Sequence, residues 1–408
     1  MTNKNLKTAL ALALLFVGAS AYGQTSPIRP AYQYPELASA QSGAASVQLG
    51  DSPVFATPYI GLAAGRDDNL FLSPSNARSS NLYVASPGIK LDARSPGLVL
   101  QSRFQAQLGR YSGSRDDDYE DFSTYNQLDA ALSQRSFLRL GYDFIRGHDP
   151  RGSTDRAIST HPDKYQLISP NATYAFGAPG AQGRVELYWS DGYKTYENNR
   201  TTTFLSDRDT RDVGGAFYWR VMPKTYVLLD LRDTEVHYRA SSSPFSSEEK
   251  RYYVGVTWDA TAATSGTFKA GRLKKEFDSG LPDFSGTGWE GSITWAPRTY
   301  STLDFYTART ANEATGLGDF ILSDIYGVSW NHAWSSIVST GVNLRRQRDA
   351  YQGFARTDET TTLGLKVGYK FRRWLTLGAE YTHTKRDSNQ DLFDYDKNLY
   401  LLTATATM

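Results

Sequence analysis

The sequence predicts an all-β fold: a transmembrane antiparallel β-barrel of about 18 strands, with short periplasmic turns and longer extracellular loops. Three observations lead to this prediction. Apolar and polar residues alternate along most of the chain, a hairpin ending in an aromatic residue recurs at nearly constant spacing, and short connections alternate with longer polar ones.

The composition favours strands over membrane helices. The chain has 408 residues, of which 40% are apolar and 13% aromatic, and it contains no cysteine. Its mean hydropathy of −0.49 excludes a polytopic helical membrane protein, because each spanning helix needs a run of about 18 apolar residues. The lack of cysteine excludes disulfides and thiolate metal sites.

The first residues have the features of a cleaved export signal over 1–21. Lys4 and Lys7 precede the apolar stretch "TALALALLFVG", and "ASA" at 19–21 supplies the small residues of a peptidase site. Cleavage would lower the 44 basic residues by these two lysines to 42, against 43 acidic residues. The mature charge of about −1 gives no basic excess for a nucleic-acid partner.

Two further units follow the signal. Residues 22–55 mix Pro, Ala, Ser, Gly and Gln without sustained periodicity, and we expect a flexible periplasmic segment there. Residues 56–408 carry the alternating pattern and form the predicted barrel. In "LVLQSRFQAQL" at 98–108 and "TTLGLKVGYKF" at 361–371, every second side chain is mostly apolar and the intervening ones are mostly polar or Gly.

The recurrent hairpin carries an aromatic residue just before a turn. Five such residues lie 35 to 39 positions apart: Trp219, Trp258, Trp295, Trp330 and Tyr369. A propeller blade of about 40 residues would hold four short strands, whereas each of these repeats holds two longer ones. We interpret the five aromatics as outward-facing residues at the membrane interface, where aromatic rings collect in outer-membrane barrels.

The connections distinguish the two ends of the barrel. Short turns such as "SPG" at 95–97, "APR" at 296–298 and "FRRW" at 371–374 alternate with longer polar loops such as "GHDPRGSTDRAISTHPD" at 147–163. This asymmetry is typical of outer-membrane barrels, whose short turns are periplasmic.

Strands are predicted to begin near residues 56, 82, 98, 119, 136, 164, 184, 210, 225, 250, 266, 287, 299, 321, 336, 359, 374 and 397. An even number closes the sheet without an edge, as lipid requires. The end, "YLLTATATM", alternates to the last residue and is similar to the signal read by the barrel-assembly machinery, with Met408 where Phe or Trp is usual.

If the apolar face meets lipid, the polar face lines a hydrated lumen, because a barrel of about 18 strands cannot fill its interior with side chains unless a loop folds in. The residues predicted to line the lumen, as candidate sugar contacts, are Arg103, Gln105, Tyr125, Asp129, Arg139, Asp143, Glu186, Tyr188, Tyr218, Asp230, Arg232, Tyr253, Glu290, Asp304, Tyr306, Lys366 and Glu380. The plainer interpretation is that each is a polar group in contact with water. The inward charges form no run of one sign, which disfavours a strongly ion-selective porin.

Catalysis and metal binding have weaker support. The five histidines are scattered, and none lies beside a second His at zinc-ligand spacing. His332 and the pair His148-Asp149 would suit a lipid hydrolase or a protease, but an interfacial His and an ordinary loop are simpler interpretations. The acidic motifs at 66–69 and 114–121 suit calcium or a solvated loop. We therefore expect no enzyme, cofactor or metal.

One segment resembles a known family. The motif "DDNLF" at 67–71, a Ser- and Asn-rich loop, and Pro87-Gly88 before an alternating strand are similar to the outer-membrane β-barrel porins encoded in exopolysaccharide biosynthesis operons (EpsL-like). The resemblance covers residues 56–408. It implies that the barrel moves a secreted polysaccharide across the cell outer membrane together with a periplasmic polysaccharide export protein.

The sequence therefore predicts a passive conduit for exopolysaccharide in the outer membrane. Its expected partners are the lipid bilayer and lipopolysaccharide, the barrel-assembly machinery, the periplasmic export protein and the polysaccharide. Two alternatives stay open. One is a general or sugar-uptake porin, and the other is a structural or assembly barrel with a plugged lumen.

Overall fold

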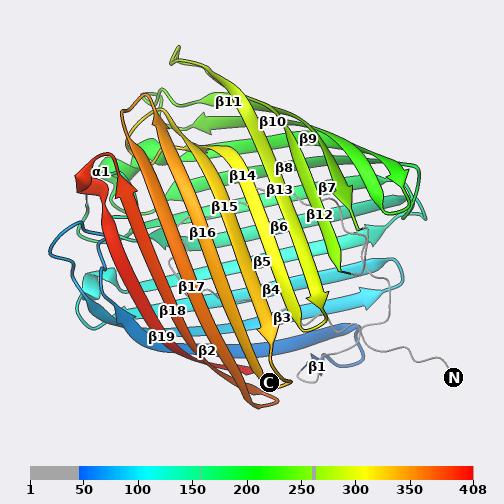
Figure 1. The fold of residues 1–408 in the computed structure, drawn as a ribbon, viewed down its shortest axis with the longest axis horizontal. Helices are drawn as coiled ribbons and strands as arrows, with labels where there is room; N and C mark the ends of the chain where they lie inside the picture. Colours follow the sequence, from blue (N-terminus) through cyan, green and yellow to red (C-terminus); the bar gives the residue numbers. More distant parts are fainter. Residues whose placement is uncertain (1–45, 157, 260–262, 408) are drawn as a thin grey trace.

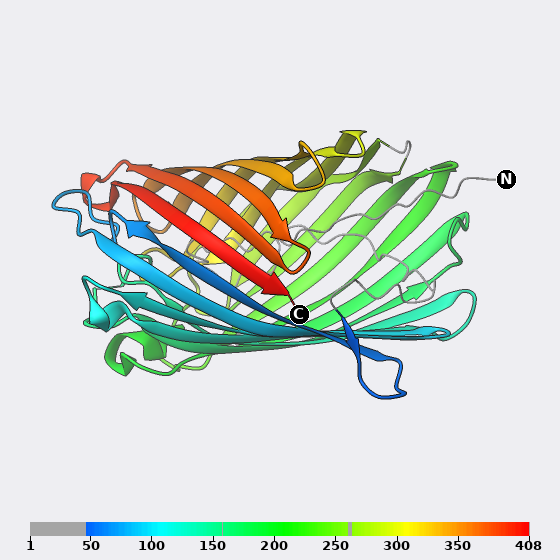
Figure 2. The same ribbon diagram turned by 90° about the horizontal axis from the view of Figure 1, so that it is seen from below.

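The computed structural model describes residues 46–156, 158–259 and 263–407. They form a closed antiparallel barrel in which each of the 18 strands β2 to β19 pairs with the next along the chain and β19 pairs with β2 (Figures 1 and 2). In this part of the chain, no helix is long and apolar enough to cross a membrane. The predicted fold class is confirmed.

The strands of the first half are β1 (Val47–Gln48), β2 (Val54–Asp67), β3 (Ser80–Ser95), β4 (Leu98–Tyr111), β5 (Tyr119–Ala131), β6 (Ser136–Asp149), β7 (Asp163–Phe176), β8 (Gly183–Tyr196), β9 (Arg208–Met222) and β10 (Thr225–Tyr238). Those of the second half are β11 (Ser247–Trp258), β12 (Thr264–Phe277), β13 (Phe284–Arg298), β14 (Ser301–Glu313), β15 (Phe320–Ala333), β16 (Val338–Gln352), β17 (Thr357–Arg372), β18 (Leu375–Ser388) and β19 (Tyr395–Thr407). The loops contain the helix α1 (Arg200–Thr203) and the 3-10 turns η1 (Arg115–Asp117), η2 (Phe204–Ser206) and η3 (Asp391–Phe393).

Every predicted strand start lies within three residues of an observed one. The largest differences are at β11 and β13, which begin earlier than the predicted 250 and 287. The first residues of β11, such as Ser247 and Glu249, are polar, and in β13 Phe284 is followed by Ser285, Gly286 and Thr287, so regular apolar alternation does not reach the start of either hydrogen-bonded ladder. The sequence pattern therefore follows the lipid-facing part of each strand better than its polar end.

The N-terminal predictions are only partly covered by the structure. The predicted signal at 1–21 and residues 22–45 lie outside the described residues, as does Met408. Within the segment expected to be flexible, Val47 and Gln48 form β1 and pair with Ala56 and Phe55 of β2. β1 and the end of β19 lie at the same end of the barrel (Figure 1).

The two ends of the barrel differ as expected, but some predicted turns belong to strands. "APR" at 296–298 is the irregular end of β13, where the register with β14 shifts between Trp295 and Arg298, and the turn itself is 299–300. Likewise, 371–372 belong to β17 and the turn is 373–374. Pro297 lacks a backbone N–H donor, which suits it to such an irregular position.

Two ladders end early on the long-loop side. The β5–β6 pairing ends at Phe122 and Arg146, and the β13–β14 pairing ends at Trp289 and Arg309. Beyond Arg309, Ala311 packs with Leu273 and Phe277 of β12. By strand alternation Ala311 faces outward and Leu273 faces inward, so the end of β14 lies inside the end of β12.

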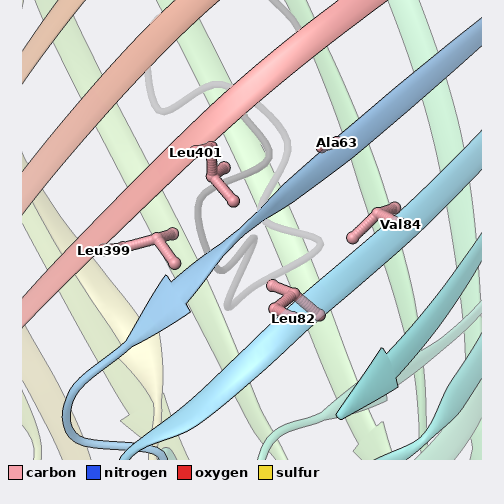
Figure 3. Close-up of a cluster of buried hydrophobic side chains, with 5 residues drawn as sticks. All are labelled: Ala63, Leu82, Val84, Leu399 and Leu401. Carbon is pink, nitrogen blue, oxygen red and sulfur yellow. The ribbon is translucent and has the colours of Figure 1, made fainter. Parts of the chain in front are cut away.

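One part of the inner face is apolar. Figure 3 shows Ala63, Leu82, Val84, Leu399 and Leu401 on β2, β3 and β19, which form a buried cluster. Alternation places these side chains on the same face as the predicted lumen residues. The expectation of a polar lining is therefore wrong at these three strands, where the five side chains bury apolar surface against one another.

Candidate functional site

The ladder registers place the predicted lumen residues on the inner face. Arg103 pairs with Tyr125, which pairs with Asp143. The other cross-strand pairs continue this face around the ring, and Asp143, Arg232 and Tyr306 of the predicted set line a cavity inside the barrel. The five predicted interface aromatics have the opposite parity. Among them, Trp219 and Trp295 are nearly half exposed.

Many of the predicted residues belong to a buried charge network on β8 to β13, which we call the charged wall. Lys269 Nζ contacts Asp230 and lies 2.9 Å from Glu290 Oε2, and Arg232 Nη1 lies 3.2 Å from Glu290 Oε1. Arg251 Nη1 lies 3.6 Å from the same Glu290 oxygen. Opposite charges at these distances compensate for one another's loss of water.

Three of the predicted sugar-contacting tyrosines are also part of this wall. The Tyr188 hydroxyl donates to Asp230 at 2.8 Å, and the Tyr218 hydroxyl donates to Glu186 at 3.2 Å. Tyr188, Tyr218 and Tyr253 expose 4%, 5% and 1% of their surface. We correct the expectation of sugar contact at these three residues, because neighbouring side chains cover their rings.

The remaining predicted residues differ in exposure. Tyr125 is 37% exposed, and the guanidinium carbon of Arg103 lies over it, 4.7 Å from the centre of the tyrosine ring. Asp129 accepts from Arg139 Nε at 2.7 Å, and Tyr59 donates to Gln105 at 3.2 Å. Further round the barrel, Asp304 accepts from the Thr294 hydroxyl at 2.7 Å, and Lys366 lies 2.7 Å from Glu380. All of these groups are anchored to neighbours; Gln105 and Asp129 are buried at 8% and 3% exposure, and Tyr125 is open.

Our selection of lumen residues missed several members of the charged wall. Lys269, Lys275, Glu249 and Arg251 face inward and were not selected. Strand parity alone would have found them, because each lies an even number of positions from an inward residue on its strand. Lys275 Nζ lies 2.8 Å from Glu313 Oε1, a contact that depends on the overlap of β14 with β12.

The stretch of the inner face from β15 to β18, which is separated from the charged wall by β14, carries many short neutral side chains, and we call it the small-residue wall. Arg345, Lys366, Glu380 and Arg386 also face inward on these strands. Its inward positions include Ser329, Asn331, Gly341, Asn343, Thr360, Thr362, Gly364, Thr382 and Thr384. Glycine and short polar side chains occupy much less of the lumen than the arginine, lysine and tyrosine side chains of the charged wall. The lumen is therefore asymmetric.

A chamber of about 1050 Å³ occupies the long-loop end of the lumen. Its lining includes Asp143, Arg232 and Tyr306 from the predicted set. It also includes Thr362 and Thr382 of the small-residue wall. Both walls and several loops thus enclose one polar space.

The loop between β6 and β7 reaches across this chamber. Arg356 Nη1 donates to Asp155 at 2.7 Å, and Thr315 donates to the same carboxylate at 2.9 Å. Tyr351 donates to it at 3.2 Å. β6 and β15 are nine strands apart in a ring of 18, so these contacts join opposite sides of the mouth. We call this contact the mouth clasp.

The clasp is held from both sides. Arg156, next to Asp155, lies 2.8 Å from Asp163 and 3.4 Å from Asp149 near the base of its own loop. On the far side, Arg356 is buried and contacts Asp358. Burial opposes the positive charge, but the hydrogen bond to Asp358 and the carboxylate of Asp155 raise the pKa of Arg356 above its usual value.

The acidic motifs have structural partners. Asp67 is 2% exposed and lies 2.6 Å from Lys397, and Asp117 is buried against Arg151. These two carboxylates are therefore not solvated loop acids, whereas Asp116 and Glu120 of the second motif expose 64% and 67% of their side chains. In the described part of the chain, no group of three or more His, Cys, Asp or Glu side chains is arranged to hold a metal ion.

The two singled-out histidines also have ordinary surroundings. His148, at the end of β6, lies 2.9 Å from Asp121 and bridges the place where the β5–β6 ladder ends. His332 packs against Trp334, with ring centres 4.3 Å apart, and against Tyr300 and Trp330. These contacts account for the two histidines as structural residues.

Comparison with solved structures finds barrels of low identity. The FrpB iron transporter from Neisseria meningitidis (F3-3 variant) is 11% identical over 81% of this chain, with a TM-score of 0.44, and the chain spans 62% of its length. A BenF-like porin from Pseudomonas fluorescens Pf-5 is 10% identical over 88% of this chain and all of its own, with a TM-score of 0.48. A bacterial polysaccharide outer membrane secretin is 9% identical over 86% and 98% of the two chains, with a TM-score of 0.37. At these scores the likenesses carry no argument about what the barrel transports.

A search of curated protein sequences finds no match to this chain. The model of the family described as "Putative beta-barrel porin 2" matches residues 54–408, which is the whole barrel. The fold and the family indicate a channel rather than an enzyme, and a location in the outer membrane of a Gram-negative cell. The chain therefore belongs to this family of β-barrel porins.

Proposed function

We propose that the barrel is a passive, water-filled conduit through which a secreted exopolysaccharide leaves the cell. The observation that carries the proposal is the lumen itself, where a polar chamber of about 1050 Å³ is bordered by charges that largely pair with one another. The resemblance of "DDNLF" at 67–71 and of Pro87-Gly88 to porins of exopolysaccharide operons supplies the class of solute.

The mechanism requires no bond chemistry. The closed sheet satisfies its backbone hydrogen bonds internally and excludes lipid, while its polar inner face remains hydrated. A polymer rich in hydroxyl groups can exchange hydrogen bonds with water and with short polar side chains as it moves. Paired charges such as Lys366 and Glu380 would attract neither cations nor anions strongly.

The proposed partners follow from this mechanism. A periplasmic export protein would deliver the polymer to the short-turn end, and lipopolysaccharide would surround the long-loop end. The alternating strand β19 ends the barrel and is the segment that the barrel-assembly machinery would read.

A second candidate is a general or sugar-uptake porin. The mouth clasp favours it, because a loop joined across the lumen limits passage to small solutes unless it moves. The third candidate, a plugged structural or assembly barrel, would conduct no solute.

Deletion of the gene tests the proposal against both alternatives. Extracellular polysaccharide should fall and small-solute uptake should stay unchanged, and the intact gene supplied in trans should restore secretion. Unchanged polysaccharide with reduced uptake would contradict export and favour the uptake porin. Unchanged values for both would favour a structural barrel.

A further inference from the structure

One part of the inner wall consists of short residues that are nevertheless buried. Ala63 of β2 lies between Gly61 and Gly65 on its own strand and pairs with Val84 on one side and Thr403 on the other. We call these five residues the inner patch. Side chains of an 18-stranded wall leave the lumen open, so such short residues should be accessible to water. Ala63 and Val84, however, expose only 9% and 4% of their surface (Figure 3).

The described connections at both ends of the barrel lie away from the inner patch. Leu72 and Asp155, from two of the long loops, line the mouth chamber, whereas Ala63 and Val84 do not. At the other end, the turn between β3 and β4 contains only residues 96–97. The parts of the chain outside the described residues are 1–45, 157, 260–262 and 408, and only the first is long enough to cover the patch.

β1 directs the preceding chain up the barrel wall. Val47 pairs antiparallel with Ala56, so the chain before Val47 runs toward the long-loop end. Continued in this register, it would arrive opposite Tyr59, where Thr407 of β19 already pairs. The chain must therefore leave the sheet just before β1. Residues 22–45 are largely polar and lack strand alternation, which excludes lipid and leaves the lumen or the periplasm.

We propose that residues 22–45 dock in the lumen from the short-turn end, with "IRPAYQYPEL" at 28–37 against the inner patch, and that they narrow the passage. This inference rests on the proposed conduit and adds a means of regulation to it. Ala63 lies about 24 Å beyond Ala56 along β2. Residues 38–46 span up to about 30 Å when extended, so the segment can reach the patch.

The chemistry of the segment suits this surface. The stretch 28–37 carries four large apolar or aromatic side chains: Ile28, Tyr32, Tyr34 and Leu37. These side chains can bury apolar surface against Val84 and against Leu82 and Leu401 beside it. The two prolines of the stretch have no N–H donor that would lose its hydrogen bond to water. The stretch contains one Arg and one Glu, so it adds no net charge to the lumen.

Thiol labelling tests the docking, because the native chain has no cysteine. Val84→Cys places a thiol in the inner patch, and Thr382→Cys is the matched control in the mouth chamber. Each is made in the full-length chain, in a chain that lacks residues 24–44, and in a full-length chain that also carries Tyr32→Ala and Tyr34→Ala. The purified proteins are treated in lipid vesicles with a charged methanethiosulfonate reagent on both sides, and the rate of the mass shift and the single-channel current are recorded.

We expect Val84→Cys to be labelled about tenfold faster or more in the shortened chain than in the full-length chain, because docking leaves only a minor fraction of the molecules open. The variant with both tyrosine changes should lie between them. The rate at Thr382→Cys should be similar in all three chains, which shows that the barrel is folded. The shortened chain should also carry a larger current.

Three results would count against the proposal. Equally fast labelling of Val84→Cys in all three chains would place the segment in the periplasm and overturn the docking. Equal protection in all three would show that the barrel itself covers the inner patch, which also overturns the docking. Faster labelling of the shortened chain with an unchanged current would overturn the narrowing.

The test separates this inference from the proposed function. Labelling reports docking whether or not a polysaccharide passes, whereas deletion of the gene reports export. If secretion depends on the gene but Val84→Cys is labelled equally fast in all chains, the docking is wrong and the export function stands. If labelling follows the expected pattern but secretion is unchanged, the export function is wrong and the docking stands.

Discussion

At the scale of single residues, the charged wall depends on Lys269. This side chain is 2% exposed and lies between two buried carboxylates, Asp230 and Glu290. A buried ion pair stabilises a protein little in comparison with apolar residues of similar volume. Removing Lys269 nevertheless costs much, because Asp230 and Glu290 are buried and lose a positive charge that water cannot replace, although Arg232 and Arg251 remain beside them.

We therefore expect Lys269→Met to lower the free energy of unfolding by about 3–5 kcal/mol. The matched control is Lys366→Met, whose lysine contacts Glu380 with 23% of its side chain exposed, and there the loss should be about 1 kcal/mol or less. Urea unfolding in lipid vesicles, followed by tryptophan fluorescence, measures both variants. Equal losses would contradict the distinction between the buried ion pairs of the charged wall and the more exposed pair on the small-residue wall.

The sequence predicts which residues lie on the inner face, but it does not predict which of their side chains form ion pairs. Period-two alternation places Arg232 and Glu290 inside from the sequence alone. Their contact at 3.2 Å joins β10 and β13, which are not neighbouring strands. It depends on the tilt and stagger of the barrel, and local alternation carries no information about them. For the same reason, we expected Tyr253 to be open to sugar, whereas it is buried.

At the scale of elements, the overlap of β14 with β12 has no sequence signal. Glu313 has outward parity on β14 and yet contacts Lys275 on the inner face of β12. Alternation predicts which side of its own strand a residue occupies, and it does not predict where a ladder stops. The early ends of the β5–β6 and β13–β14 ladders accompany the mouth clasp, which joins the hairpin ends of β6–β7 and β14–β15.

Asp155→Ala should weaken the mouth clasp. The change removes the acceptor shared by Arg356, Thr315 and Tyr351, while Arg356 keeps its contact with Asp358. We expect larger and noisier single-channel currents, because the β6–β7 loop is no longer held to the opposite side. Asp116→Ala, in the loop between β4 and β5 with 64% of its side chain exposed, is the control and should leave the current unchanged. Identical currents in all three proteins would show that the clasp does not limit the mouth.

At the scale of the whole molecule, closure of the barrel was the most predictable property. The number of strands, the asymmetry of the connections and the outward aromatics can all be recognised in the sequence. The reason is that the apolar positions and interfacial aromatics of a strand mark where it enters and leaves the membrane. The apolar inner patch at β2, β3 and β19 was not expected, since Leu82 and Leu401 fit the alternation only on the face we assigned to water. The division of the lumen into two unlike walls also depends on contacts between distant strands.

The central claim is that this barrel encloses a continuous aqueous passage. Planar-bilayer recording of the purified full-length protein tests it most directly. We predict discrete conductance steps that are proportional to voltage and select weakly between cations and anions, because the inner charges largely pair with one another. Inserted protein that conducts no ions, both as wild type and as Asp155→Ala, would contradict the passage and identify a plugged barrel.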